Sequence, residues 1–137
     1  MEIILTNHAV AEFKRHIKAS GTPKEILRNL SYFFSKNPQL VHANSYTLPR
    51  RGKQPKSKGP QIYLARNSWK FSKVFLLLIF DHGAYTAVTT LSGREFRSGL
   101  NKERITDVRE KPVDEGILYK HGSLEMRLPT APHARNS

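Results

Sequence analysis

Acidic residues are absent from a long internal part of this chain. From Ile26 to Phe80 there is no aspartate or glutamate, although the whole sequence contains 11 of them. Because a solvated surface normally mixes both signs of charge, an acid-free segment predicts a continuous positive field unless the fold disperses it. Such a field favours a polyanion as partner, most often a nucleic acid. The basic residues of this segment are Arg28, Lys36, Arg50, Arg51, Lys53, Lys56, Lys58, Arg66, Lys70 and Lys73.

Cysteine is absent as well, which excludes disulfides, thiolate catalysis and cysteine zinc sites. The longest apolar run, Val74 to Phe80, is far too short to span a bilayer. The first residues lack the charged and then apolar pattern of a secretory signal. We therefore expect a cytoplasmic protein with no membrane partner, and nothing in the sequence indicates a cofactor or a metal.

What is present supports a folded basic domain. The chain has 137 residues, a formal net charge of +12 and a pI near 10.2, and 38% of its residues are hydrophobic. This length and composition predict one ordinary domain with a real core. We expect a single nucleic-acid-binding domain over residues 1–128, with a basic loop at 49–60 that has no apolar residue and a flexible tail at 129–137.

Local patterns predict the elements of an α+β fold. Residues 1–5 read as a strand, and Thr6 or Asn7 can cap a helix over residues 8–18. A second helix begins at Thr22-Pro23, where Glu25 completes a capping box, and stops at Asn37-Pro38. Because only a short turn separates the two helices, we expect them to pack as an antiparallel hairpin.

Strands are predicted over residues 40–48, 61–66, 73–80 and 85–91, the last two joined by a turn at Asp81-His82-Gly83. The continuously apolar run at 73–80 is typical of a central strand covered on both faces. The predicted fold is a helical hairpin on one face of a four- to five-stranded, mainly antiparallel sheet. Residues 92–137 are then a C-terminal extension, with a small hairpin over 117–119 and 124–128.

Two short motifs resemble a known ribonuclease group. The opening I-I-L-T-N-H-A-V-A-E-F-K-R-H-I resembles the start of small RelE-like and BrnT-like proteins, in which a strand precedes a helix with an S/T-x-H-A-x-x-R/F-x-x-R signature. The V-x-T-[VT] end of their last strand matches Ala87-Val88-Thr89-Thr90. The resemblance covers residues 1–91 and implies the barnase, EndoU, colicin and RelE-like fold, which includes toxin ribonucleases and phage-encoded nucleases. The motif positions on the helix are Thr6, His8, Ala9, Phe13, and Arg15 or His16.

Metal-independent RNA cleavage needs an acid, a base and cations that stabilise the charged phosphate. Histidine suits proton transfer near neutrality, and arginine can hold a phosphate bidentately. His8 is the first candidate for acid or base, because the resemblance places a functional histidine there and a helix N-terminus attracts phosphate. The spacing of His8, Glu12 and His16 also permits a zinc site, although no further ligand is nearby. The candidate catalytic residues are His8, Arg15, His16, Thr89 and Arg94.

Aromatic and basic residues interleave after the predicted basic loop. Tyr63 or Trp69 could stack on a base of single-stranded RNA while neighbouring cations hold phosphates. A tryptophan at position 69 is more often a core anchor. Thr89 and Thr90 end a strand, and we expect one of them to point away from the core. The candidate nucleic-acid-binding residues are Arg50, Arg51, Lys53, Lys56, Lys58, Tyr63, Arg66, Trp69, Lys70 and Arg97.

Three functions fit these features. The first is a metal-independent, toxin-like or phage-derived endoribonuclease that acts on RNA, on tRNA or at a ribosome and is restrained by an antitoxin. The second is a non-catalytic protein of the same fold that binds nucleic acid, RNA in preference to DNA. The third is a basic protein that binds and inhibits an acidic host protein. Nothing in the sequence demands catalysis, because the acid-free segment explains binding alone.

Overall fold

The computed structural model describes residues 1–44, 61–100 and 102–129. The predicted basic loop at 49–60, with Arg50, Arg51, Lys53, Lys56 and Lys58, lies outside the described residues, as does the predicted tail from residue 130 onward. In chain order the elements are β1 (Glu2–Leu5), α1 (Asn7–Ile17), α2 (Pro23–Phe34), β2 (Pro38–Ala43), β3 (Gln61–Arg66), β4 (Val74–Asp81), β5 (Ala84–Ser92), α3 (Gly93–Ser98), η1 (Lys102–Asp107, a 3-10 helix), β6 (Arg109–Pro112), β7 (Ile117–His121) and β8 (Leu124–Leu128).

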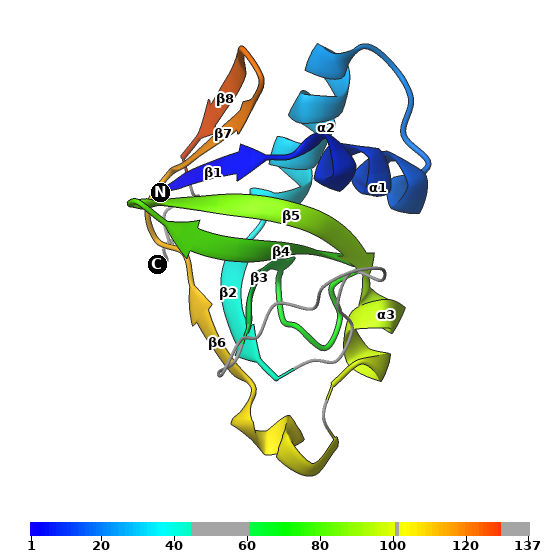
Figure 1. Cartoon of the computed structure of the whole chain (residues 1–137), viewed down its shortest axis with the longest axis vertical. Helices are drawn as coiled ribbons and strands as arrows, with labels where there is room; N and C mark the ends of the chain where they lie inside the picture. Colours follow the sequence, from blue (N-terminus) through cyan, green and yellow to red (C-terminus); the bar gives the residue numbers. More distant parts are fainter. Residues whose placement is uncertain (45–60, 101, 130–137) are drawn as a thin grey trace.

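The strands form one mixed sheet in the order β6-β2-β3-β4-β5-β1-β7-β8 (Figure 1). The α+β class is confirmed, but the predicted four to five strands are too few. Residues 92–128 do not form an appendage: β6 pairs with β2 at one edge, and the β7–β8 hairpin extends the other edge beside β1. β6 was missed because all four of its residues, R-E-K-P, are exposed and carry no apolar alternation.

The sheet is strongly curled, and its connectivity requires this. β6 and β7 occupy the first and seventh positions but are joined only by residues 113–116. In a flat sheet six inter-strand spacings would separate them by about 29 Å, whereas five residue steps reach at most about 18 Å. The connection instead crosses the inner side of the curl, where the Val113 amide donates to the Pro38 carbonyl at 2.9 Å and the Leu118 amide donates to the Met1 carbonyl at 2.9 Å.

Helices cover both faces of the central strands. Val74, Leu76 and Leu78 of β4 belong to the core beneath α1 and α2, whereas Phe75 and Leu77 face a second core beneath α3. The prediction that this strand is covered on both faces is therefore confirmed for its first five residues. The two predicted helices lie on one face of the sheet as expected, and α3, which was not predicted, lies on the other. Its signal was available in the sequence, because the S-G-R-E pattern over residues 92–95 is a second capping box.

Most local signals in the N-terminal part of the sequence are confirmed. The side chain of Thr6 accepts from the Ala9 amide at 3.0 Å, and Thr22 and Glu25 form the predicted capping box. The β4–β5 hairpin closes through His82 and Gly83, both with positive φ, as a two-residue hairpin turn of this twist requires. No helix in the described part of the chain combines the length and apolar character needed to cross a bilayer.

Candidate nucleic-acid interface

Basic residues from separate segments lie at one end of the sheet, where β3 ends and β4 and α3 begin. Arg66 pairs with Pro38 across β2 and β3, and the next residue, Asn67, donates its amide to the Asn37 carbonyl at 3.0 Å. The Gly93 amide donates to the Lys73 carbonyl at 2.7 Å, which brings the start of α3 to the start of β4. We call this region the basic end; its members are Lys36, Arg66, Lys70, Phe71, Lys73 and Arg94.

The lysines and Arg66 of the basic end form no direct ion pair within the described part of the chain. Within the described residues, Lys36, Arg66, Lys70 and Lys73 have no carboxylate within 4 Å. The nearby Glu110 carboxylate instead accepts from the Trp69 amide at 3.0 Å and from the Ser68 hydroxyl at 3.3 Å. Lys36, Lys70 and Lys73 are exposed and remain available to an external anion, whereas the Arg66 guanidinium lies over the Phe33 ring, 4.8 Å from its centroid.

Phe71 stands out among these cations, and the sequence patterns did not single it out. Its side chain is 78% exposed, the largest exposed fraction among the exposed large hydrophobic residues described. The turn that holds it is closed by the Phe71 amide, which donates to the Ser68 carbonyl at 3.0 Å. Lys70 and Lys73 flank it in the sequence K-F-S-K. An aromatic ring between lysines was the available signal, but it was hidden beside the apolar run that begins at Val74.

Arg97, a predicted nucleic-acid-binding residue, stabilises the turn over residues 69–72 by hydrogen bonds. Its Nη1 donates to the carbonyl oxygens of Trp69, Lys70 and Ser72 at 3.3, 3.2 and 3.3 Å. Gly93 makes this approach feasible, because a Cβ there would lie 2.2 Å from the Ser72 carbonyl oxygen. The guanidinium is therefore committed to backbone acceptors and positions the turn that carries Lys70 and Phe71. Arg94, by contrast, is exposed on the first turn of α3.

The two aromatic residues predicted to stack on bases are used inside the protein. Tyr63 is fully buried, packs edge-on against Phe96 at 4.8 Å between ring centroids, and donates its hydroxyl to Gln61 at 3.0 Å. Trp69 is half-buried with its ring 6.2 Å from that of Phe96. Neither ring has a free face comparable to that of Phe71, because the second core on this side of the sheet occupies them.

Arg15 and His16 lie at the C-terminal end of α1, where it meets α3. The Arg15 guanidinium donates to the Glu12 carboxylate at 2.6 Å. This hydrogen bond and the positive charge of Arg15 lower the pKa of Glu12, and the same hydrogen bond and the negative charge of Glu12 raise the pKa of Arg15. Nε2 of His16 lies 3.2 Å from Oε1 of Glu95, and the His16 side chain is only 11% exposed. Arg15 is thus paired with a carboxylate, and His16 is largely buried beside another.

His8 and Thr89 differ in exposure. His8 is exposed on the first turn of α1, about 12 Å along the helix axis from His16. Thr89 is 5% exposed, and Thr90 is also buried, donating its hydroxyl to the Ala9 carbonyl at 2.7 Å. The expectation that one of these threonines points away from the core is wrong, since α1 covers one face of β5 and α3 covers the other.

The acid-free segment is divided by the β2–β3 ladder. Pro38 and Arg66 pair at the basic end, whereas Ala43 and Gln61, between which the undescribed residues are inserted, pair at the opposite end. Five residue steps separate these ends, about 17 Å. The described cations of the segment therefore do not lie beside the attachment points of the predicted basic loop.

No three metal-ligating side chains come together within the described ranges, and Glu12, the centre of the zinc spacing noted above, is bound by Arg15. Comparison with protein-family models, with curated proteins and with solved structures found no match to this chain.

Proposed function

We propose that this protein binds single-stranded nucleic acid through the basic end. The observation that supports this is an aromatic residue that is 78% exposed, Phe71, set among cations that have no carboxylate partner in the described structure. Lysine and arginine attract phosphates by charge, and an exposed aromatic ring stacks on an unpaired base of any identity. The resemblance to RelE-like ribonucleases favours RNA over DNA.

In the proposed binding mode, the affinity does not depend on the base sequence of the nucleic acid. Lys70, Lys73 and Arg94 would contact successive phosphates. A base that lies between those phosphates along the strand would stack on the Phe71 ring. Such contacts release counterions, so the affinity falls steeply with salt. Arg97 contributes indirectly, because it fixes the turn on which Lys70 and Phe71 stand.

The test is the salt dependence of binding to a single-stranded RNA oligonucleotide. For single strands the slope of log affinity against log salt falls by about 0.7 for each phosphate that the protein no longer neutralises. We expect the double variant Lys70→Gln/Lys73→Gln to bind with a slope about 1.4 shallower than the wild type, at unchanged thermal stability. The matched control Lys14→Gln/Lys24→Gln removes the same charge from exposed positions on α1 and α2.

Equal reductions of affinity in the two double variants would mean that only net charge matters, and the basic end would lose its assignment. Capture of a partner from a lysate that survives nuclease treatment would instead favour an acidic protein as the ligand. Binding to RNA that is independent of salt would also contradict the proposal.

Metal-independent RNA cleavage is the second candidate, and the exposure of His8 favours it. The side chain is accessible on the first turn of α1, where the helix dipole attracts phosphate. The other proposed catalytic groups contribute less to this candidate, because Arg15 and His16 are engaged by Glu12 and Glu95 and Thr89 is buried. The cleavage hypothesis therefore depends on His8 as one acid or base, on Arg94 as the phosphate-binding cation, and on a second proton-transferring group.

Cleavage is tested by incubating total RNA and tRNA with the protein in the presence of EDTA. Loss of cleavage in a folded His8→Ala variant would support the enzyme. Cleavage that continues undiminished in that variant would remove His8 from the mechanism, and binding without any cleavage would leave the non-catalytic function.

A further inference from the structure

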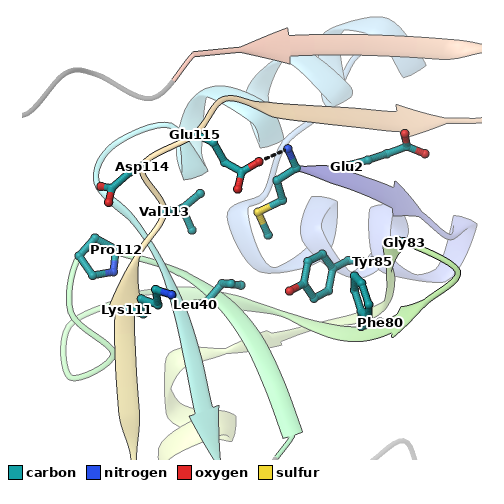
Figure 2. Close-up of a pocket in the computed structure, with 11 residues that line it drawn as sticks. Glu2, Leu40, Phe80, Gly83, Tyr85, Lys111, Pro112, Val113, Asp114 and Glu115 are labelled. Atoms are coloured by element: carbon teal, nitrogen blue, oxygen red, sulfur yellow. Dashed lines mark hydrogen bonds and ion pairs between the residues drawn. The ribbon is translucent and has the colours of Figure 1, made fainter.

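The inner side of the curled sheet contains a cavity of about 640 Å³ that shares no residue with the basic end. The β6–β7 connection, the start of β1 and the tip of the β4–β5 hairpin enclose it (Figure 2). Its size is in the range of sites for small organic ligands. The lining residues that carry the argument are Leu40, Phe80, Tyr85, Lys111 and Val113.

One wall of the cavity is aromatic. Phe80 and Tyr85 lie opposite each other in the β4–β5 pairing, with ring centroids 4.8 Å apart, and Figure 2 shows the two rings side by side. Phe80 is 55% exposed although it sits in a strand whose first five residues are buried. A large exposed ring at the mouth of a cavity offers a surface on which a planar ring can stack.

The facing wall supplies a single uncommitted cation. Lys111 lies on β6 opposite Leu40, and within the described residues no carboxylate comes within 4 Å of its ammonium group. The carboxylates around the cavity are otherwise engaged: Glu115 accepts from the Met1 amino group at 2.6 Å, and Glu2 lies 3.4 Å from the Lys120 ammonium. Figure 2 shows the Asp114 carboxylate at the edge of the site, on the side away from Phe80 and Tyr85.

We propose that this cavity binds an unpaired nucleotide, with the base against Phe80 and Tyr85 and the phosphate at Lys111. A planar ring that carries an anion matches the two walls, whereas a purely apolar ligand would leave Lys111 unused and a simple anion would leave the aromatic wall unused. The inference builds on the proposed nucleic-acid binding. The nucleotide is either free or part of a longer strand.

The test is an NMR titration of untagged protein with adenosine 5′-monophosphate and, separately, with a single-stranded RNA hexamer. We expect the monophosphate to shift the amide signals of Gly83 and Val113. Phe80→Ala should weaken its binding about tenfold, since stacking on one aromatic ring contributes about 1–3 kcal/mol per base. The matched control is Tyr32→Ala, a residue 53% exposed on α2 that does not line the cavity.

Lys111→Gln separates the two parts of the ligand. It should lower the affinity for the monophosphate several-fold and leave the affinity for adenosine unchanged. Ribose 5-phosphate should not shift the amide signals of Gly83 or Val113 in any variant. If Phe80→Ala does not give a folded spectrum, Phe80→Leu removes the ring and keeps the apolar volume.

The outcomes distinguish this site from the basic end. If the hexamer shifts the amide signals of Phe71 and Lys73, and neither ligand shifts those of Gly83 or Val113, the proposed nucleotide site in the cavity is wrong. The proposed function then remains intact. A monophosphate that shifts Gly83 and Val113, with no hexamer effect at Phe71, supports a free-nucleotide site and contradicts the basic end. Unchanged monophosphate affinity in Phe80→Ala also overturns the proposal, because the aromatic wall is its main contact.

Discussion

Nε2 of His16 on α1 lies 3.2 Å from Oε1 of Glu95 on α3. This interaction joins two helices that cover opposite faces of the sheet, at the point where β5 ends. Glu95 also accepts from the Ser92 amide at 2.8 Å, so the same carboxylate completes the capping box of α3. A histidine that sequence motifs mark as catalytic is therefore placed at a structural junction.

We expect His16→Ala to lower the free energy of unfolding by about 1 kcal/mol, because it removes a largely buried side chain from the contact between α1 and α3. Urea denaturation measures this directly. The exposed His8→Ala serves as the control and should leave stability nearly unchanged. A His16→Ala protein of wild-type stability would mean that the interaction contributes nothing to the junction.

Two neighbouring arginines on α3 should respond to substitution in opposite ways. Arg97 donates to three backbone carbonyls of the 69–72 turn, so Arg97→Ala should reduce the free energy of unfolding by about 2 kcal/mol. Arg94 is exposed, so Arg94→Ala should keep its stability and weaken RNA binding. Urea denaturation and RNA titration of both variants provide the comparison. Reduced stability in Arg94→Ala, or unchanged stability in Arg97→Ala, would reverse the roles of the two arginines.

The sequence predicted those parts of the fold that depend on local signals. The caps at Thr6 and Thr22, the covered strand β4 and the turn at His82-Gly83 each depend on a few adjacent residues, and all are found in the structure. The pairings between strands that lie far apart in the sequence could not be predicted in the same way. β6 is a polar strand that exists because β2 offers it an unpaired edge, and β1 is placed between β5 and β7 by parallel pairings that leave no short-range signature.

The candidate site was predicted in its charge but not in its geometry. Lys70 and Arg66 were identified from composition, and the structure places both at the basic end. Tyr63 was misjudged as a candidate stacking residue because alternation along β3 does not reveal that α3 covers its face. Phe71 was missed for the opposite reason: its exposure depends on a turn held by Arg97, 26 residues further along the chain.

The capping box of α2 should contribute a measurable pH dependence of stability. The Thr22 amide donates to the Glu25 carboxylate at 2.8 Å, and this hydrogen bond lowers the pKa of Glu25. Because the folded-state pKa lies below the unfolded value of about 4.3, the contribution is present above that pH and is lost as the pH falls through the lowered folded pKa. The melting temperature of Glu25→Gln should therefore be below that of the wild type at pH 6, and the difference should shrink toward pH 3.

Melting curves of both proteins between pH 3 and pH 7 measure this convergence. Glu125→Gln, at an exposed position on β8, is the control for the removal of one carboxylate and should parallel the wild type. A gap between wild type and Glu25→Gln that stays constant down to pH 3 would show that the carboxylate charge is not what stabilises the cap.

Phe71 is the residue on which the proposed interface depends most directly. Its ring is exposed and makes none of the ring–ring interactions found for the other aromatic residues, so Phe71→Ala should leave the melting temperature unchanged. Stacking on one base contributes about 1–3 kcal/mol, so the affinity for single-stranded RNA should fall about tenfold while the salt slope stays the same. Fluorescence anisotropy of a labelled oligonucleotide across several salt concentrations measures both quantities.

Two controls make the result specific to this ring. Phe71→Trp should keep or increase the affinity, because it retains a stacking face, and Tyr32→Ala removes a 53% exposed ring from α2 without touching the basic end. If Phe71→Ala binds like the wild type, the cations alone account for binding and the base does not stack there. If Tyr32→Ala weakens binding as much as Phe71→Ala, the interface extends over α2 and is not confined to the end of the sheet.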